Sequence, residues 1–187
     1  MDIEFPSLAE SQRDFHSKMK AAQFFLDHIK EIYRPDNKVS TIPDKLFYYV
    51  DAVIFELHAA SQTLLQMINV KAGLNERADK VNWGSNFKSL LKQKNNDLFA
   101  WWEEFNIAPE FHVLESMRQY VSHRGGSFLQ AEVTDDKKIV LLSIPIRFRY
   151  YQGKPELKPT GRSIELIAEL TSIGSFLNSK YKELGTM

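Results

Sequence analysis

Two long amphipathic segments constrain the fold of this chain more than any other feature. Apolar residues recur at alternating steps of four and three near the N-terminus, and again in the segment that follows Pro43. The positions are Phe15, Met19, Ala22, Leu26, Ile29 and Tyr33 in the first segment and Leu46, Val50, Val53, Leu57, Ala60, Leu64 and Met67 in the second. Such spacing places one apolar stripe along the face of an α-helix.

The ends of these two helices are marked by residues that stop or start helices. Pro35 ends the first, which begins near Leu8, while Pro43 and Asp44 open the second and Gly73 closes it. Each helix is about 25 to 30 residues long, or about 40 Å. Two long striped helices joined by a short loop predict an antiparallel pair within a helical bundle.

The remaining sequence predicts shorter helices and a β-hairpin. We expect helices at 85–94 and 96–105, a helix from Pro109 to the Gly125-Gly126 pair, strands at 128–134 and 138–151, and a last helix at 163–184. The predicted fold is an all-α, up-and-down bundle of four to five main helices, with a β-hairpin inserted at about 128–151. At 187 residues we expect one domain spanning 1–187.

Composition excludes several classes of protein. The chain has no cysteine, which rules out disulfides, thiolate metal sites and a cysteine nucleophile. No apolar run reaches the ~18–20 residues of a membrane span, and the acidic N-terminus does not resemble a signal peptide. We therefore expect a cytoplasmic protein without a membrane partner.

The net charge of zero conceals an uneven distribution. Residues 1–117 carry 13 basic and 17 acidic side chains, whereas residues 118–162 carry nine basic and four acidic ones. The basic stretch is open to two interpretations. It is either a set of solvated loops or a local site for an anion such as phosphate or an RNA backbone.

The candidate chemistry lies at the end of the helix that begins at Pro109. Arg118 and His123 are separated by four residues, and Ser122 falls only about 40° from Arg118 around an ideal helix. Arg118 and His123 themselves lie roughly 140° apart. A guanidinium binds phosphate, and an imidazole gives or takes a proton near neutral pH. Together they supply a minimal set of groups for RNA cleavage without a metal or other cofactor.

A structural interpretation competes with this catalytic one. A protonated His123 would be stabilised by the C-terminal end of the helix dipole, and Arg118 would then lie on a solvated face. Spacing alone does not separate the two interpretations.

The Arg-x4-His pattern, placed late in a helical bundle, resembles the HEPN superfamily. The segment Phe55–Gln62 is also similar to the second bundle helix of some members. The resemblance implies a homodimer through the motif helix and metal-independent RNA cleavage that leaves a 2′,3′-cyclic phosphate, often in toxin–antitoxin or phage-defence systems. It implies catalytic roles for Arg118 and His123. Flanking phosphates would be held by Ser122, Arg124, Arg147 and Arg149.

Two further functions remain open. Gln119 stands where active members often have Asn, Asp or His, which favours a non-catalytic HEPN-like module that binds a nucleotide, RNA or a partner protein such as an antitoxin. The third alternative is a structural dimerisation bundle without a ligand.

Other polar and aromatic residues have simpler interpretations. We expect His58 to be a hydrogen-bonded core or boundary histidine. The alternative places it opposite Arg118 across the bundle, where it would support that residue. His112 and Glu115 have metal-ligand spacing, but no Glu-x-x-His exists, so no metal site is predicted. His16 and His28 are expected at the surface or boundary. Four aromatic residues are expected to pack in the core or at a dimer contact rather than stack on bases, namely Phe99, Trp101, Trp102 and Phe105.

Overall fold

The computed structural model describes residues 6–32, 43–124, 130–133, 139–145 and 163–187. These ranges contain six helices and three short strands. The helices are α1 (Leu8–Ile32), α2 (Asp44–Lys71), α3 (Ser85–Lys94), α4 (Asn96–Ile107), α5 (Pro109–Arg124) and α6 (Leu166–Thr186). The strands are β1 (Gln130–Val133), β2 (Ile139–Pro145) and β3 (Ser163–Glu165).

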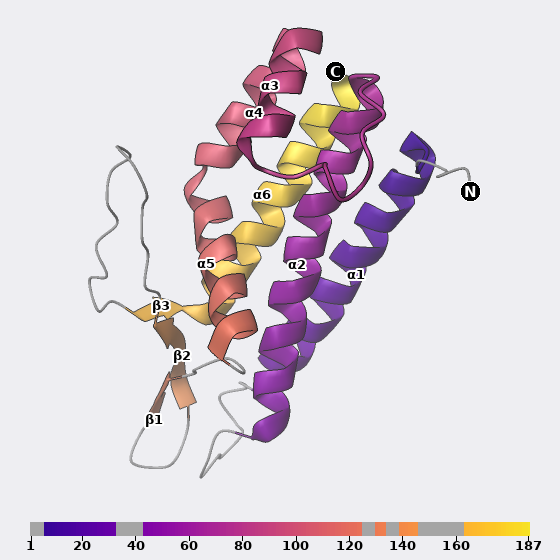
Figure 1. The fold of residues 1–187 in the computed structure, drawn as a ribbon. Helices are drawn as coiled ribbons and strands as arrows, with labels where there is room; N and C mark the ends of the chain where they lie inside the picture. Colours follow the sequence, from indigo (N-terminus) through magenta and orange to yellow (C-terminus); the bar gives the residue numbers. More distant parts are fainter. Residues whose placement is uncertain (1–5, 33–42, 125–129, 134–138, 146–162) are drawn as a thin grey trace.

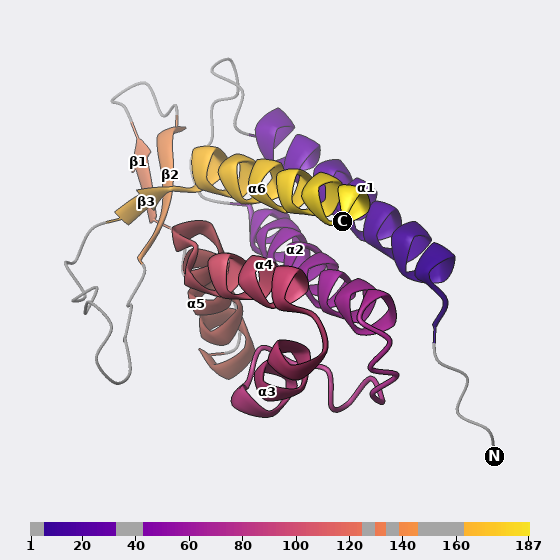
Figure 2. The same cartoon turned by 90° about the horizontal axis from the view of Figure 1, so that it is seen from above.

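Four of the helices form an up-and-down bundle, as the sequence predicts. Figure 1 shows α1 and α2 running antiparallel, with α5 and α6 repeating the alternation beside them. Helix α2 lies at the centre, because it packs against α1, α5 and α6. The view from above in Figure 2 shows α3 and α4 near the end of α2 that leads into them.

Capping residues at the ends of α1, α2 and α4 explain where these helices begin and end. At the start of α1, the Glu10 carboxylate accepts hydrogen bonds from Ser7 N and Oγ, both at 2.7 Å, and the Ser7 backbone bond is the main reason that the pKa of Glu10 is lowered. At the end of α2, Gly73 adopts a φ of +62°, which glycine tolerates without strain. Asn95 caps α4 by accepting from the N–H groups of Asp97 and Leu98.

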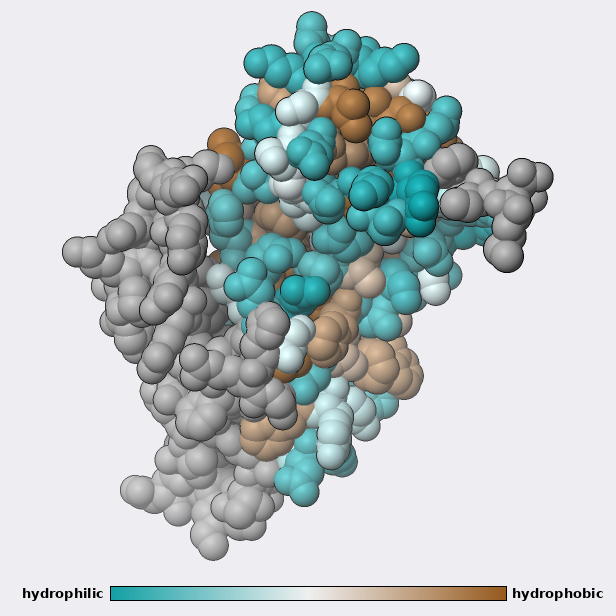
Figure 3. Space-filling model, viewed as in Figure 1, coloured by the Kyte–Doolittle hydropathy of each residue, from teal (hydrophilic) through white to brown (hydrophobic). Residues whose placement is uncertain are grey.

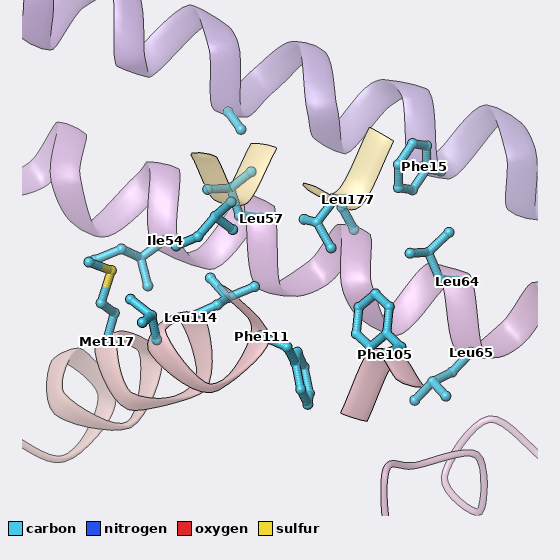
Figure 4. Packing of buried hydrophobic residues seen from close by; sticks show 14 of the residues in the cluster. Phe15, Ile54, Leu57, Leu64, Leu65, Phe105, Phe111, Leu114, Met117 and Leu177 are labelled. Carbon is cyan, nitrogen blue, oxygen red and sulfur yellow. The ribbon is translucent and has the colours of Figure 1, made fainter. Parts of the chain in front are cut away.

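The core joins the striped faces of the long helices to an aromatic cluster from the shorter ones. Phe105 of α4 is fully buried and lies within 5.2 Å, centroid to centroid, of the rings of Trp83, Trp101, Phe111 and Phe176. In Figure 4 Phe105 and Phe111 lie beneath the helix that carries Leu64 and Leu65. Trp101, Trp102 and Phe105 are buried, as predicted, and Phe99 is half-buried and packs against the core.

A buried lysine ties α6 to α4. Lys180 is only 6% exposed, and its ammonium donates to Glu104 Oε1 at 2.6 Å and to Glu183 Oε2 at 2.7 Å. Burial by itself lowers the pKa of Lys180, but the hydrogen bonds to the two carboxylates outweigh it and the pKa is raised. The ammonium is therefore charged and paired at neutral pH.

The short strands form one antiparallel sheet in the order β1-β2-β3. Gln130 of β1 is opposite Ser143 of β2, and the register shifts between Glu132 and Val133. The rest of the predicted hairpin, at 128–129, 134–138 and 146–151, lies outside the described residues. Residues 163–165, which we expected to open the last helix, instead form β3 and pair with β2.

The start of α6 differs from the prediction for a local reason. Glu165 occupies the N-cap position, and its carboxylate accepts from Ile167 N at 3.1 Å and Ala168 N at 2.6 Å. A capping side chain satisfies the free N–H groups of the first turn, so the helix begins after it.

On the face shown in Figure 3, the described residues are mostly hydrophilic, with apolar groups in separate patches. Three aromatic side chains on α1 and α2 are exposed, Phe24, Tyr48 and Phe55. Within the described ranges, no helix combines the length and apolar character that crossing a bilayer requires.

Candidate functional site

Helix α5 carries the Arg-x4-His motif and is held against α2 by its apolar stripe. Leu114, Met117 and Val121 are at most 5% exposed. Figure 4 shows Met117 beside Ile54 of α2. Pro109 at the first helical position suits the helix start, because its missing N–H would have no partner there. The polar motif residues lie on the same helix, beside this buried stripe.

Arg118 is half-buried on α5, and its guanidinium makes no ion pair or hydrogen bond with any residue that the structure describes. Ser122, one turn later, is exposed, as is the neighbouring Gln119. A permanently charged guanidinium in this environment retains its full capacity to bind an anion. Arg118 therefore has the properties that the phosphate-binding role requires.

The helix continues without interruption through His123 and ends at Arg124. On a regular helix, the five steps from Arg118 rotate His123 by about 140° and move it about 7.5 Å along the axis. The side chains at positions 123 and 124 lie outside what the structure describes, as do the whole of Arg147 and Arg149. The structure thus places Arg118 and Ser122 on one helix and leaves the other candidate groups untested.

The most direct contact near the motif is one that catalytic patterns in the sequence do not predict. His58 Nε2 of α2 lies 2.8 Å from Glu115 Oε1 of α5, with the two side chains 16% and 26% exposed. The Gln62 side-chain amide lies 3.4 Å from the same ring nitrogen. His58 is therefore a hydrogen-bonded boundary histidine, as predicted, and the residue that it contacts is Glu115.

This contact has a weak signal in the sequence. His58 follows the buried Leu57, and Glu115 follows the buried Leu114, so each polar group flanks an apolar stripe. Polar residues at the edges of two stripes that pack together are natural partners. Glu115 also had metal-ligand spacing with His112, but the described residues contain no group of three or more side chains placed to hold a metal ion.

Three surface pockets lie away from Arg118. The first, of 590 Å³, includes Lys71, Trp101 and Glu183. A second of 730 Å³ lies between α1 and α2, and a third of 320 Å³ lies between α1 and α6. Within the described part of the chain, Arg118 and His58 line none of these three pockets.

The remaining histidines have the positions expected of them. His16 is exposed and His28 half-buried on α1, and His28 Nδ1 lies 2.8 Å from the carbonyl oxygen of Phe24. Neither residue forms part of a metal-binding group among the described side chains.

An acidic cluster lies between α5 and α6. The pKa of Glu169 is raised, mainly by burial and further by the charges of Glu110 and Glu165. The folded protein therefore favours the neutral carboxyl group of Glu169. The stability that this neutral form contributes is fully present below the ordinary pKa of glutamate, and it is lost as the pH rises through the raised pKa.

We expect Glu169→Gln to stabilise the fold at neutral pH. The amide keeps the shape of the side chain and removes the repelled charge. Because the group is partly exposed to water, we expect a gain of up to about 1 kcal/mol in the free energy of unfolding. Urea unfolding of both proteins from pH 3 to 8 tests this. The gain should disappear below the ordinary pKa of glutamate, and a difference that is constant over this range would contradict the assignment.

Comparisons with known proteins do not extend these observations. The chain matches no protein-family model, no curated protein and no solved structure.

Proposed function

We propose that the chain is a metal-independent endoribonuclease of the HEPN type. Arg118 would bind the scissile phosphate, and His123 would act as a general acid or base. The observation that carries the proposal is a half-buried guanidinium on α5, without a partner among the described residues, five positions before a histidine at the end of an up-and-down bundle helix.

The reaction follows from the chemistry of these groups. A base removes the proton of the ribose 2′-OH, and the 2′-oxygen attacks the adjacent phosphorus. The P–O5′ bond breaks, an acid protonates the leaving oxygen, and the upstream product keeps a 2′,3′-cyclic phosphate. The guanidinium stabilises the negative charge that develops on the phosphate oxygens.

Two copies of the chain suit this mechanism better than one. On a regular helix Arg118 and His123 of one chain project about 140° apart, so they do not share one face. We propose that two α5 helices meet and place the Arg118 of one protomer near the His123 of its partner. The exposed Tyr48 and Phe55 on α2 would contribute apolar area to this homodimer.

The basic insertion would extend the site along the RNA. We propose that 128–151 folds as a hairpin whose Arg147 and Arg149, with Ser122 and Arg124, hold flanking phosphates. In this proposal the enzyme acts in the cytoplasm, in a toxin–antitoxin or phage-defence role, with an antitoxin protein as a partner.

The test uses an RNA with one 2′-deoxy substitution. After the cleavage positions of a short RNA have been mapped, the substitution is placed immediately upstream of one scissile phosphate. We expect cleavage to disappear at that position alone, and the other upstream products to end in a cyclic phosphate. Unchanged cleavage at the deoxy position would exclude 2′-OH attack.

One observation favours a second function. Gln119 is exposed beside Arg118, at the position where active HEPN proteins often have Asn, Asp or His. A non-catalytic module that binds RNA, a nucleotide or a protein through the same surface is therefore the alternative. It predicts that RNA is bound and recovered intact.

A further inference from the structure

Glu115 is the acidic residue of α5 that lies nearest to Arg118 in the sequence. Glu115 precedes Arg118 by three residues, and residues with this spacing are neighbours on a helix surface. Glutamate and arginine three apart commonly form an ion pair. Such a pair would neutralise the guanidinium and compete with any anion that approaches it.

In this structure the Glu115 carboxylate pairs with His58 of α2 rather than with Arg118. Its Oε1 lies 2.8 Å from Nε2 of His58 on α2, and the contact is largely shielded from water, with exposures of 26% for Glu115 and 16% for His58. A carboxylate accepts hydrogen bonds, so the imidazole donates its Nε2–H to Glu115. Arg118 has no ion pair or hydrogen bond with the described residues.

We propose that His58 holds Glu115 away from Arg118 and thereby keeps the guanidinium open to an anionic ligand. His58 is in this sense a positioning residue, because it acts on Arg118 through Glu115. The proposal rests on the anion-binding role of Arg118 in the proposed function, and it does not require that RNA be cleaved.

Removal of the imidazole is then expected to weaken anion binding at Arg118. In His58→Leu, Glu115 loses its donor and is free to turn to Arg118. A carboxylate paired with the guanidinium repels an incoming phosphate and occupies its hydrogen-bond donors. We expect phosphate affinity at Arg118 to fall roughly three- to tenfold.

Three variants separate this effect from general damage to the fold. His58→Gln keeps a side-chain N–H donor and should retain most of the wild-type affinity. Glu115→Gln removes the competing charge, and its affinity should equal or exceed that of wild type. The double variant His58→Leu/Glu115→Gln should recover the affinity that His58→Leu loses, because the released side chain no longer carries a charge.

The experiment is a titration with inorganic phosphate, followed by the ¹⁵Nε–¹Hε NMR signal of Arg118. Arg118→Ala assigns the signal, and the exposed Arg77, which pairs with Asp79 at 3.2 Å, is the internal control. We expect Glu115→Gln to bind phosphate at least as tightly as the wild type, and His58→Gln and the double variant to bind it nearly as tightly. His58→Leu should bind phosphate more weakly than all of these proteins.

Three outcomes would overturn the proposal. They are a wild-type Arg118 signal that does not respond to phosphate, a His58→Leu variant that binds phosphate as tightly as the wild type, and a double variant as weak as His58→Leu, which would assign the loss to structural damage. If phosphate binds as described and RNA is not cleaved, the ribonuclease assignment fails and the role of His58 stands. The two proposals are therefore tested separately.

Discussion

Replacement of Arg118 or His123 by alanine is expected to abolish RNA cleavage while the fold is retained. Loss of one group that stabilises charge on the reacting phosphate lowers a rate by about 10²–10³-fold, and loss of a general acid or base lowers it by about 10²–10⁴-fold. Arg118 is half-buried and has no partner among the described residues, so its removal leaves no described group unpaired. Cleavage rates are measured with a labelled RNA under single-turnover conditions.

The matched control removes a guanidinium elsewhere. Arg77 lies in the connection between α2 and α3 and pairs with Asp79. Arg77→Ala should cleave at the wild-type rate. Circular dichroism and thermal unfolding of all three variants show whether the fold is intact. Equal cleavage by wild type, Arg118→Ala and His123→Ala would contradict the assigned roles.

Phe105→Ala is expected to cause the largest loss of stability. Phe105 is fully buried and contacts the rings of Trp83, Trp101, Phe111 and Phe176. Truncation of a buried phenylalanine costs about 3–5 kcal/mol, because burial is lost and a cavity remains. For a chain of this length that lowers Tm by about 8–13 °C.

Phe24→Ala is the control for this prediction. Phe24 is 56% exposed on α1, so its removal should change the free energy of unfolding by about 0.5 kcal/mol or less. Urea unfolding of both variants gives the comparison. Similar losses in Phe105→Ala and Phe24→Ala would show that the aromatic cluster is not the centre of the core.

The sequence predicts the helical elements well because their signals are local. The apolar stripes, together with Pro43 and Gly73, predict α1 and α2 to within two residues, and the predicted 85–94 coincides with α3. Proline, glycine and periodic apolar residues act on the backbone within a few positions, so their effect can be recognised without knowledge of the fold.

The start of α6 is harder to predict from the sequence, because it depends on partners that are distant along the chain. Ile164 pairs with Ile144 of β2, and that pairing makes 163–165 extended rather than helical. A strand of three residues has almost no pattern of its own, and its conformation follows from the neighbouring strand.

In the candidate site, too, local features can be predicted from the sequence, whereas contacts between distant residues cannot. The identities of Arg118 and His123 and the spacing between them can be read directly from the sequence, and so can their place near the end of a helix. The contact between His58 and Glu115 cannot, because it requires α2 and α5 to pack in one particular rotation. Whether an arginine is free to bind an anion depends on such contacts, and spacing alone does not show it.

The most direct test of the central claim is incubation of the pure protein with total RNA in excess EDTA, beside His123→Ala. We expect the wild type to cleave the RNA under these conditions and the variant to leave it intact. Cleavage by both proteins would remove His123 from the mechanism. Intact RNA with the wild type would contradict metal-independent cleavage and favour the binding module.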